Sequence, residues 1–156
     1  DEVVYSPDIS IIKMAEEYDW KLIPVGHHQK LNFVACCGIR FPELITKTET
    51  DDNNKKWLNP NDVNILEIKI KTIIQTAIKY KHNTIVFGAM GCGAWNNPPE
   101  HVAKIFKKIL TSDEYNGAIL NYYFAIMNTK DENNIVRNRN KMSENGGKAT
   151  PIILPK

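Results

Sequence analysis

Three glycines lie close together in the middle of the chain, Gly88, Gly91 and Gly93, and an aromatic residue, Trp95, follows them. An apolar, β-branched run precedes the glycines, and the sequence Asn-Asn-Pro-Pro-Glu after Trp95 is typical of a helix start. Glycine lets the backbone adopt positive φ and approach a ligand closely, and the free amides of a helix N-terminus favour an anion. The pattern predicts a strand, a phosphate-binding loop and a helix, and therefore a nucleotide-like ligand.

The glycine spacing alone leaves another interpretation open. The order GxxGxG differs from the dinucleotide fingerprint GxGxxG, no acidic residue ends a second strand about twenty positions later, and the Lys-Ser/Thr of a P-loop is missing. A tight strand-to-helix turn that needs glycine only for its geometry would give the same residues. The apolar strand before the loop and the helix start after it favour the ligand-binding interpretation.

Cysteine and histidine offer weaker candidates. The pair Cys36-Cys37 follows an apolar run, and His27-His28 lies in the turn before that run, so a thiol nucleophile with a base, or a zinc site, is conceivable. The spacing does not match structural zinc sites, and buried cysteine more often packs as a small hydrophobe. We expect Cys92, inside the glycine loop, to be a packing group too. His101 falls in the first helical turn, where a positive charge opposes the helix dipole, so a neutral or surface histidine is expected.

The composition limits the function classes. A chain of 156 residues, 42% of them hydrophobic, predicts a single domain spanning 1–156. The net charge of +2 with dispersed lysines argues against nucleic-acid binding. Three cysteines without CxxC spacing favour a reducing, cytoplasmic location. No membrane span or signal peptide is evident, and no cofactor or metal is predicted. The opening DEVVYSPD is typical of an interior segment, so a longer parent chain is expected, and the oligomeric state is left open.

The first part of the chain predicts short extended elements. We expect an extended segment that stops at Ser6-Pro7-Asp8, a strand buried on both faces of a parallel sheet, and a long solvated loop. A mobile insertion explains that loop more simply than a ligand lid does. The expected elements are an extended Val3–Tyr5, a short helix or irregular edge at Ile9–Tyr18, a strand at Leu22–Val25, a buried strand at Leu31–Cys37 and a loop at Ile45–Lys56.

The second part alternates helices with strands. Asn59 and Pro60 form a helix start, with an N-cap and proline at the first position, and apolar residues then follow at helical spacing up to a stop near Lys81-His82-Asn83. The elements expected after it are a strand at Thr84–Phe87, a helix at Pro98–Leu110, a strand at Ala118–Met127, a short polar helix at Asn134–Glu144 and a strand at Thr150–Leu154. The alternation predicts an α/β fold, a three-layer α/β/α arrangement on a parallel or mixed sheet.

The run GAMGCGAWNNPPEHVAKIF resembles the phosphate-loop signature of microbial poly(ADP-ribose) glycohydrolase-like macrodomains. In that family a strand leads into GAxGCGxxxNxP and then into a helix of the form xxVAxxF. YSPDI near the start resembles the family's SPxV segment, and LNFVACC lies where the family has a strand leading to a loop on the adenine or ribose side. The resemblance covers most of the chain and is specific over the glycine loop. It implies a macrodomain-like mixed sheet and a pocket for ADP-ribose.

The resemblance also implies which residues contact the ligand. Backbone amides of the loop would face the diphosphate, Trp95 would orient the distal ribose unless it is a packing aromatic, and Asn97 would cap the helix near the ligand. Asn128 follows a strand whose next loop often lines the adenine or ribose site in macrodomains. The expected ligand-binding set is Gly88, Ala89, Gly91, Cys92, Gly93, Ala94, Trp95, Asn97 and Asn128. Valine at position 91 or 93 is expected to abolish binding with little loss of fold.

One part of the family pattern is missing from this sequence. Hydrolases of the family carry Gly-Gly-Gly followed by Gln-Glu-Glu upstream of SPxV, and the second half of that motif supplies the general acid. Glu16-Glu17 has no glycine run before it and falls in MAEEYDW, a predicted helix surface, so no catalytic residue is assigned. Arg137 and Arg139 could meet a phosphate, but decoration of a polar helix is the simpler interpretation.

Three functions therefore stay open. The missing motif favours a reader or sensor that binds ADP-ribose, a small derivative or an ADP-ribosylated protein. The alternative is an ADP-ribose glycohydrolase whose catalytic motif lies outside this sequence. A third possibility is an unrelated α/β protein whose loop mimics the signature.

Overall fold

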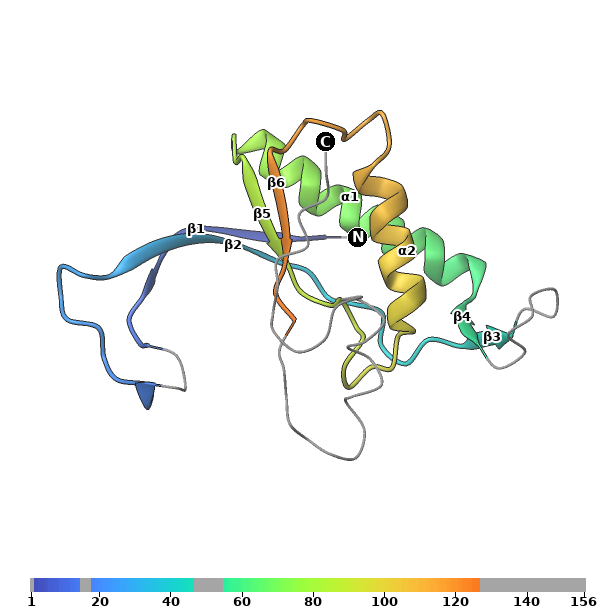
Figure 1. Cartoon of the computed structure of the whole chain (residues 1–156), viewed down its shortest axis with the longest axis horizontal. Coiled ribbons are helices and arrows are strands. Elements are labelled where there is room, and N and C mark those ends of the chain that lie inside the picture. Colours follow the sequence, from blue (N-terminus) through green and yellow to red (C-terminus); the bar gives the residue numbers. More distant parts are fainter. Residues whose placement is uncertain (1, 15–17, 47–54, 127–156) are drawn as a thin grey trace. The chain divides into compact units, whose positions relative to one another are not determined.

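The computed structural model describes residues 2–14, 18–46 and 55–126 (Figure 1). They divide into two compact units, of which one is formed by Glu2–Cys36 and the other begins at Cys37. The helix expected at 134–144 and the strand expected at 150–154 lie outside the described residues.

The first unit is a β-hairpin of β1 (Val4–Ile11) and β2 (Gln29–Ala35), which pair antiparallel. The register shifts between Ser6 and Ile9, where Asp8 adopts a φ of 56° and its amide donates to Asn32 Oδ1 at 3.0 Å. The expected stop at Ser6-Pro7-Asp8 is therefore wrong. The strand passes through this turn-forming sequence as a bulge, because a bulge accommodates an unpaired residue in the left-handed region.

Other expectations for this unit also need correction. The residues Ile9–Ile11 belong to β1 and form no helix, and Leu22 makes only an isolated bridge with Lys13. Strand β2 is largely exposed, with Leu31 at 49% and Phe33 at 46%, and its partner β1 runs antiparallel. An apolar run predicts a strand, but its neighbours decide its direction and burial, and these are non-local.

The second unit begins with a short antiparallel pair, β3 (Leu44–Thr46) and β4 (Lys56–Leu58). Both strands fall partly within the loop expected at Ile45–Lys56, so that expectation is wrong at its two ends. The intervening residues 47–54 lie outside the described part of the chain.

The two helices follow the sequence closely. Helix α1 (Pro60–Lys79) has the expected cap, since Asn59 Oδ1 accepts from the Asp62 amide at 2.9 Å, and it ends a few residues earlier than expected. Helix α2 (Pro99–Leu110) carries its buried residues on one stripe, as its periodicity predicts. Neither of these two described helices has the length and apolar character that a membrane crossing requires. Their buried residues are Leu66, Ile70, Ile73, Ile74 and Ala77 of α1, and Val102, Ile105, Phe106, Ile109 and Leu110 of α2.

Strands β5 (Thr84–Phe87) and β6 (Asn121–Phe124) pair in parallel, and β6 is shorter than the expected Ala118–Met127 because turns occupy the residues before it. Phe87 packs against Phe106 of α2, with ring centroids 5.0 Å apart. This contact packs α2 against β5. The α/β class is confirmed, and the described strands form three two-stranded sheets.

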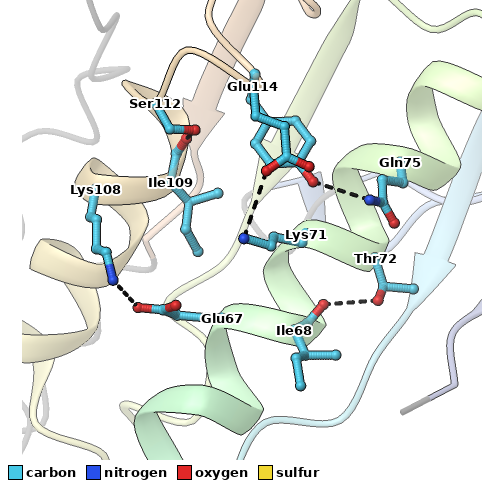
Figure 2. Close-up of polar contacts among 10 residues, drawn as sticks. Glu67, Ile68, Lys71, Thr72, Gln75, Lys108, Ile109, Ser112 and Glu114 are labelled. Atoms are coloured by element: carbon cyan, nitrogen blue, oxygen red, sulfur yellow. Dashed lines mark hydrogen bonds and ion pairs between the residues drawn. The ribbon is translucent and has the colours of Figure 1, made fainter.

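Polar contacts also join α1 to α2 and to the turn that follows α2 (Figure 2). Lys108 Nζ of α2 lies 2.7 Å from Glu67 Oε1 of α1, and Lys71 Nζ of α1 lies 3.7 Å from Glu114 Oε2. Gln75 Nε2 donates to the Tyr115 hydroxyl at 3.1 Å. Such partly exposed pairs each contribute little, but with the apolar stripes they hold the axis of α2, and hence its N-terminus, in place.

Candidate functional site

The segment Gly88–Asn97 joins the carboxyl end of β5 to the N-terminus of α2, so the predicted order of strand, loop and helix is confirmed. The helix cap differs from the expectation. Pro98 occupies the N-cap position, makes no side-chain cap, and accepts from the Val102 amide at 3.0 Å. Asn97 is therefore not the helix cap, because it lies one residue too early and its side chain points elsewhere.

Asn97 instead braces the loop from inside. Its side chain is only 1% exposed. Its Nδ2 atom lies 2.7 Å from Ile39 O, 3.0 Å from Gly91 O and 3.3 Å from Trp95 O. Its backbone amide also donates to Gly91 O at 3.0 Å. The residue ties both ends of the loop to the segment around Ile39, so its role in the described structure is to position the loop.

The hydrogen bonds of Asn97 require a glycine at position 91. It adopts a φ of +70°, and a β-carbon built on it would lie 2.5 Å from Asn97 Nδ2 and 2.7 Å from Asn97 Cγ. Any side chain here would displace the brace and strain the backbone. The expectation that valine at position 91 leaves the fold nearly intact is therefore wrong.

Two glycines of the loop have no close neighbour among the described residues. A β-carbon on Gly88 or Gly93 would meet nothing within 4 Å, and both residues are exposed. The amides of Cys92 and Asn96 donate within the loop, to Ala89 O at 3.1 Å and Gly93 O at 3.0 Å. Within the described part of the chain, the amides of Gly93 and the exposed Ala94 donate to no backbone carbonyl. Two adjacent amides of exposed residues, without a backbone partner among the described residues, can donate to an anion.

The thiol of Cys92 lies on the inner side of the loop. The residue is 3% exposed, and Sγ lies 3.5 Å from Met90 O. Burial raises the pKa of Cys92 to about 12, because a thiolate is poorly solvated there. The thiol is therefore neutral at ordinary pH and packs in the core, as expected from the sequence.

A second segment forms a wall of the loop, and sequence reasoning missed it. A β-carbon on Gly38 would lie 2.9 Å from the Gly91 nitrogen and 3.3 Å from Cε3 of Trp95. Gly38 and Ile39 therefore contact the loop directly, and the half-buried Trp95 ring lies against Gly38. The available signal was a glycine soon after an apolar strand, which marks a close approach of two backbones.

A side-chain cluster fixes the first turn of α2. The Leu58 amide of β4 donates to His101 Nδ1 at 2.9 Å, and the His101 ring meets Trp57 edge-on with centroids 4.7 Å apart. Lys104 Nζ lies 4.4 Å from the centroid of the Trp57 ring. Because Nδ1 accepts a hydrogen bond it carries no proton, in agreement with the neutral histidine expected from the helix dipole.

The remaining candidates do not converge on a site. His28 Nε2 lies 2.9 Å from Ile23 O, and His28 and Cys36 lie beyond opposite ends of β2, so the thiol and base are kept apart. No cluster of metal-ligating side chains occurs among the residues described. Outside those residues lie the candidates Glu16, Glu17, Asn128, Arg137 and Arg139.

Neither a protein-family model nor a curated protein matches the sequence. Solved structures do match. Poly(ADP-ribose) glycohydrolase from Deinococcus radiodurans in complex with ADP-ribose matches with a TM-score of 0.67 at 19% identity, covering 91% of this chain and 52% of that one. The enzyme from Thermomonospora curvata matches with a TM-score of 0.64 at 16% identity, covering 90% and 45%. The chain thus has the mixed α/β fold of bacterial poly(ADP-ribose) glycohydrolases and spans about half of their length.

Proposed function

We propose that this chain binds ADP-ribose, or a ligand derived from it, through the loop Gly88–Asn97. The observation that carries the proposal is the pair of amides at Gly93 and Ala94, which are exposed and donate to no backbone carbonyl of the described residues. They precede the N-terminus of α2, whose dipole adds to the attraction for a diphosphate. The two ends of such a ligand would extend along the loop to either side.

The fold supports the choice of ADP-ribose among diphosphates. The solved structures with this fold include one crystallised with ADP-ribose. We propose the same macrodomain-like arrangement here, with the mixed sheet covered on both faces in three α/β/α layers. Within it, Gly88, Ala89, Gly91, Trp95 and Asn128 complete the predicted contact set.

We further propose that the chain acts as a reader or sensor. No Asp or Glu occurs between Gly88 and Asn97. The first carboxylate after the loop, Glu100, lies 3.2 Å from Lys104 Nζ and 3.6 Å from Lys55 Nζ. Because Glu100 is engaged in ion pairs with these two lysines, no general-acid role is assigned to it. The ligand can then be free ADP-ribose, a small derivative or an ADP-ribosylated protein.

Glycohydrolase activity is the second candidate function. It is favoured by the matching solved structures, which are named poly(ADP-ribose) glycohydrolases. In this case the general acid comes from residues other than the described ones, and the loop holds the substrate while that acid acts.

Calorimetric titration with ADP-ribose tests the binding proposal. Gly93→Val should abolish binding, since its side chain enters open space over the amides. Ala118→Val is the matched control: Ala118 is exposed and precedes β6, so it lies at the opposite end of the parallel strand pair. Normal binding by Gly93→Val would overturn the assignment of the loop.

An assay of ADP-ribose release from polymer separates the two functions. Binding without release establishes a reader. Release by this chain would instead establish a hydrolase and would overturn the reader role.

A further inference from the structure

Arg40 is a cationic residue that directly follows a segment in contact with the glycine loop. The loop Gly88–Asn97 contains no Lys, Arg or His, so it offers only amide dipoles to an anion. Arg40 follows Gly38 and Ile39, the residues that contact Gly91 and Asn97 of the loop. Arg40 is therefore the one cationic residue among the loop and residues 38–40.

The backbone at Arg40 is held against the loop by contacts on the residues just before it. Ile39 O lies 2.7 Å from Asn97 Nδ2, and the Gly38 backbone approaches Gly91 so closely that a β-carbon there would lie 2.9 Å from the Gly91 nitrogen. Arg40 is bonded directly to the Ile39 carbonyl, so its position relative to the loop follows from the same brace.

The guanidinium of Arg40 lies at the end of an exposed side chain. Within the described ranges no carboxylate pairs with it. The guanidinium makes a cation–π contact with the neighbouring Phe41, whose ring centroid lies 5.5 Å from Arg40 Cζ. A ring beside a guanidinium restricts the orientation of its fork without neutralising its charge. Among the described residues, the N–H donors of the fork therefore have no acidic side-chain partner.

We propose that Arg40 is a specificity-determining residue that contacts the phosphate groups of the ligand, an inference that rests on the proposed function of the loop. The planar guanidinium donates two parallel hydrogen bonds to phosphate oxygens, while the amides of Gly93 and Ala94 donate to others. Arg40 would then select for phosphorylated ligands over the corresponding nucleoside. It is a binding residue, and no proton transfer is assigned to it.

The test compares Arg40→Gln, Arg40→Lys and the charge-matched control Lys107→Gln by calorimetry with ADP-ribose and with adenosine. Lys107 is exposed in the last turn of α2, about 12 Å of helix from its start. We expect Arg40→Gln to weaken ADP-ribose binding by roughly 10- to 100-fold and to leave the affinity for adenosine unchanged. Arg40→Lys should retain part of the affinity, and Lys107→Gln all of it.

Three results would overturn the inference. Equal affinity of wild type and Arg40→Gln for ADP-ribose would remove Arg40 from the site while leaving the loop assignment intact. Parallel losses for ADP-ribose and adenosine, or a lowered unfolding midpoint in urea, would assign Arg40 a structural role. Absence of ADP-ribose binding in the wild type would overturn the proposed function itself, and the Arg40 assignment with it.

Discussion

The side-chain amide of Asn97 occupies the space that a β-carbon on Gly91 would need. Nδ2 lies 3.0 Å from the Gly91 carbonyl oxygen, and a β-carbon on Gly91 would lie 2.5 Å from the same nitrogen. The hydrogen bond and the missing side chain are thus parts of one arrangement. The shape of the loop that presents the amides of Gly93 and Ala94 depends on this arrangement.

Gly91→Ala should lower the free energy of unfolding by about 1–3 kcal/mol, because the new β-carbon meets Asn97 and the residue is forced to keep positive φ. Urea unfolding followed by far-UV circular dichroism measures the change. The matched control is Gly93→Ala, where a β-carbon meets nothing within 4 Å and stability should be unchanged or slightly higher. Equal effects at the two positions would contradict the brace.

Asn97→Ala should destabilise the fold by about 1–3 kcal/mol, since it removes the donor shared by the carbonyls of Ile39, Gly91 and Trp95. It should also weaken ADP-ribose binding, because the loop loses its tie to the Ile39 segment. Hydrogen exchange of the loop amides reports this loosening directly. Unchanged protection of the Gly91 and Trp95 region in the variant would show that Asn97 does not hold the loop.

Cys92 should make the protein less stable at alkaline pH. Burial raises its pKa from 9.0 to about 12 in the folded state. Between these values the unfolded chain has lost the proton and the folded chain keeps it, so the free energy of unfolding falls as pH rises, by at most about 1.4 kcal/mol per pH unit. Urea midpoints measured from pH 8 to pH 10 check this.

The control for that titration is Cys92→Ala, which should lose the pH dependence between pH 9 and pH 10. A decline above pH 10 should remain, because the pKa of Tyr115 is also raised, from 10.0 to about 12, chiefly by burial. An identical pH profile in wild type and Cys92→Ala would show that the thiol is not buried in solution.

His101→Ala should destabilise the chain by about 1–3 kcal/mol, because the buried Leu58 amide loses its acceptor, His101 Nδ1. His101→Asn is the informative comparison, since its Oδ1 lies near the position of Nδ1 and can accept the same hydrogen bond. The midpoint of thermal unfolding of His101→Asn should lie between those of the wild type and of His101→Ala. If the two variants are equally destabilised, the packing of the His101 ring on Trp57 contributes to stability and the hydrogen bond does not.

Local patterns in the sequence predicted the helices and the loop between β5 and α2. Asn59 and Pro60 define the start of α1 because capping depends on residues within one turn. The buried stripe of α2 follows from the spacing of its apolar residues. The glycine loop was recognisable because a requirement for glycine is a property of the local backbone.

The sequence was less informative where partners are distant. The apolar run at Leu31–Cys37 correctly indicated a strand, but not that β2 would pair antiparallel with β1 and remain largely exposed. The turn signal at Ser6-Pro7-Asp8 was overridden by strand pairing across the hairpin. Sheet pairing joins residues far apart in the chain, so no local preference encodes it.

The sequence by itself therefore determined that a glycine loop joins a strand to a helix, and which residues form the loop. Only the tertiary structure decided the roles of those residues. Asn97, expected to cap the helix, instead donates a hydrogen bond to Ile39, 58 positions away in the chain. The tertiary structure also placed Gly38 against the loop. The reason is physical: capping and periodicity are local, whereas a buried carboxamide binds whichever carbonyls the folded chain brings to it.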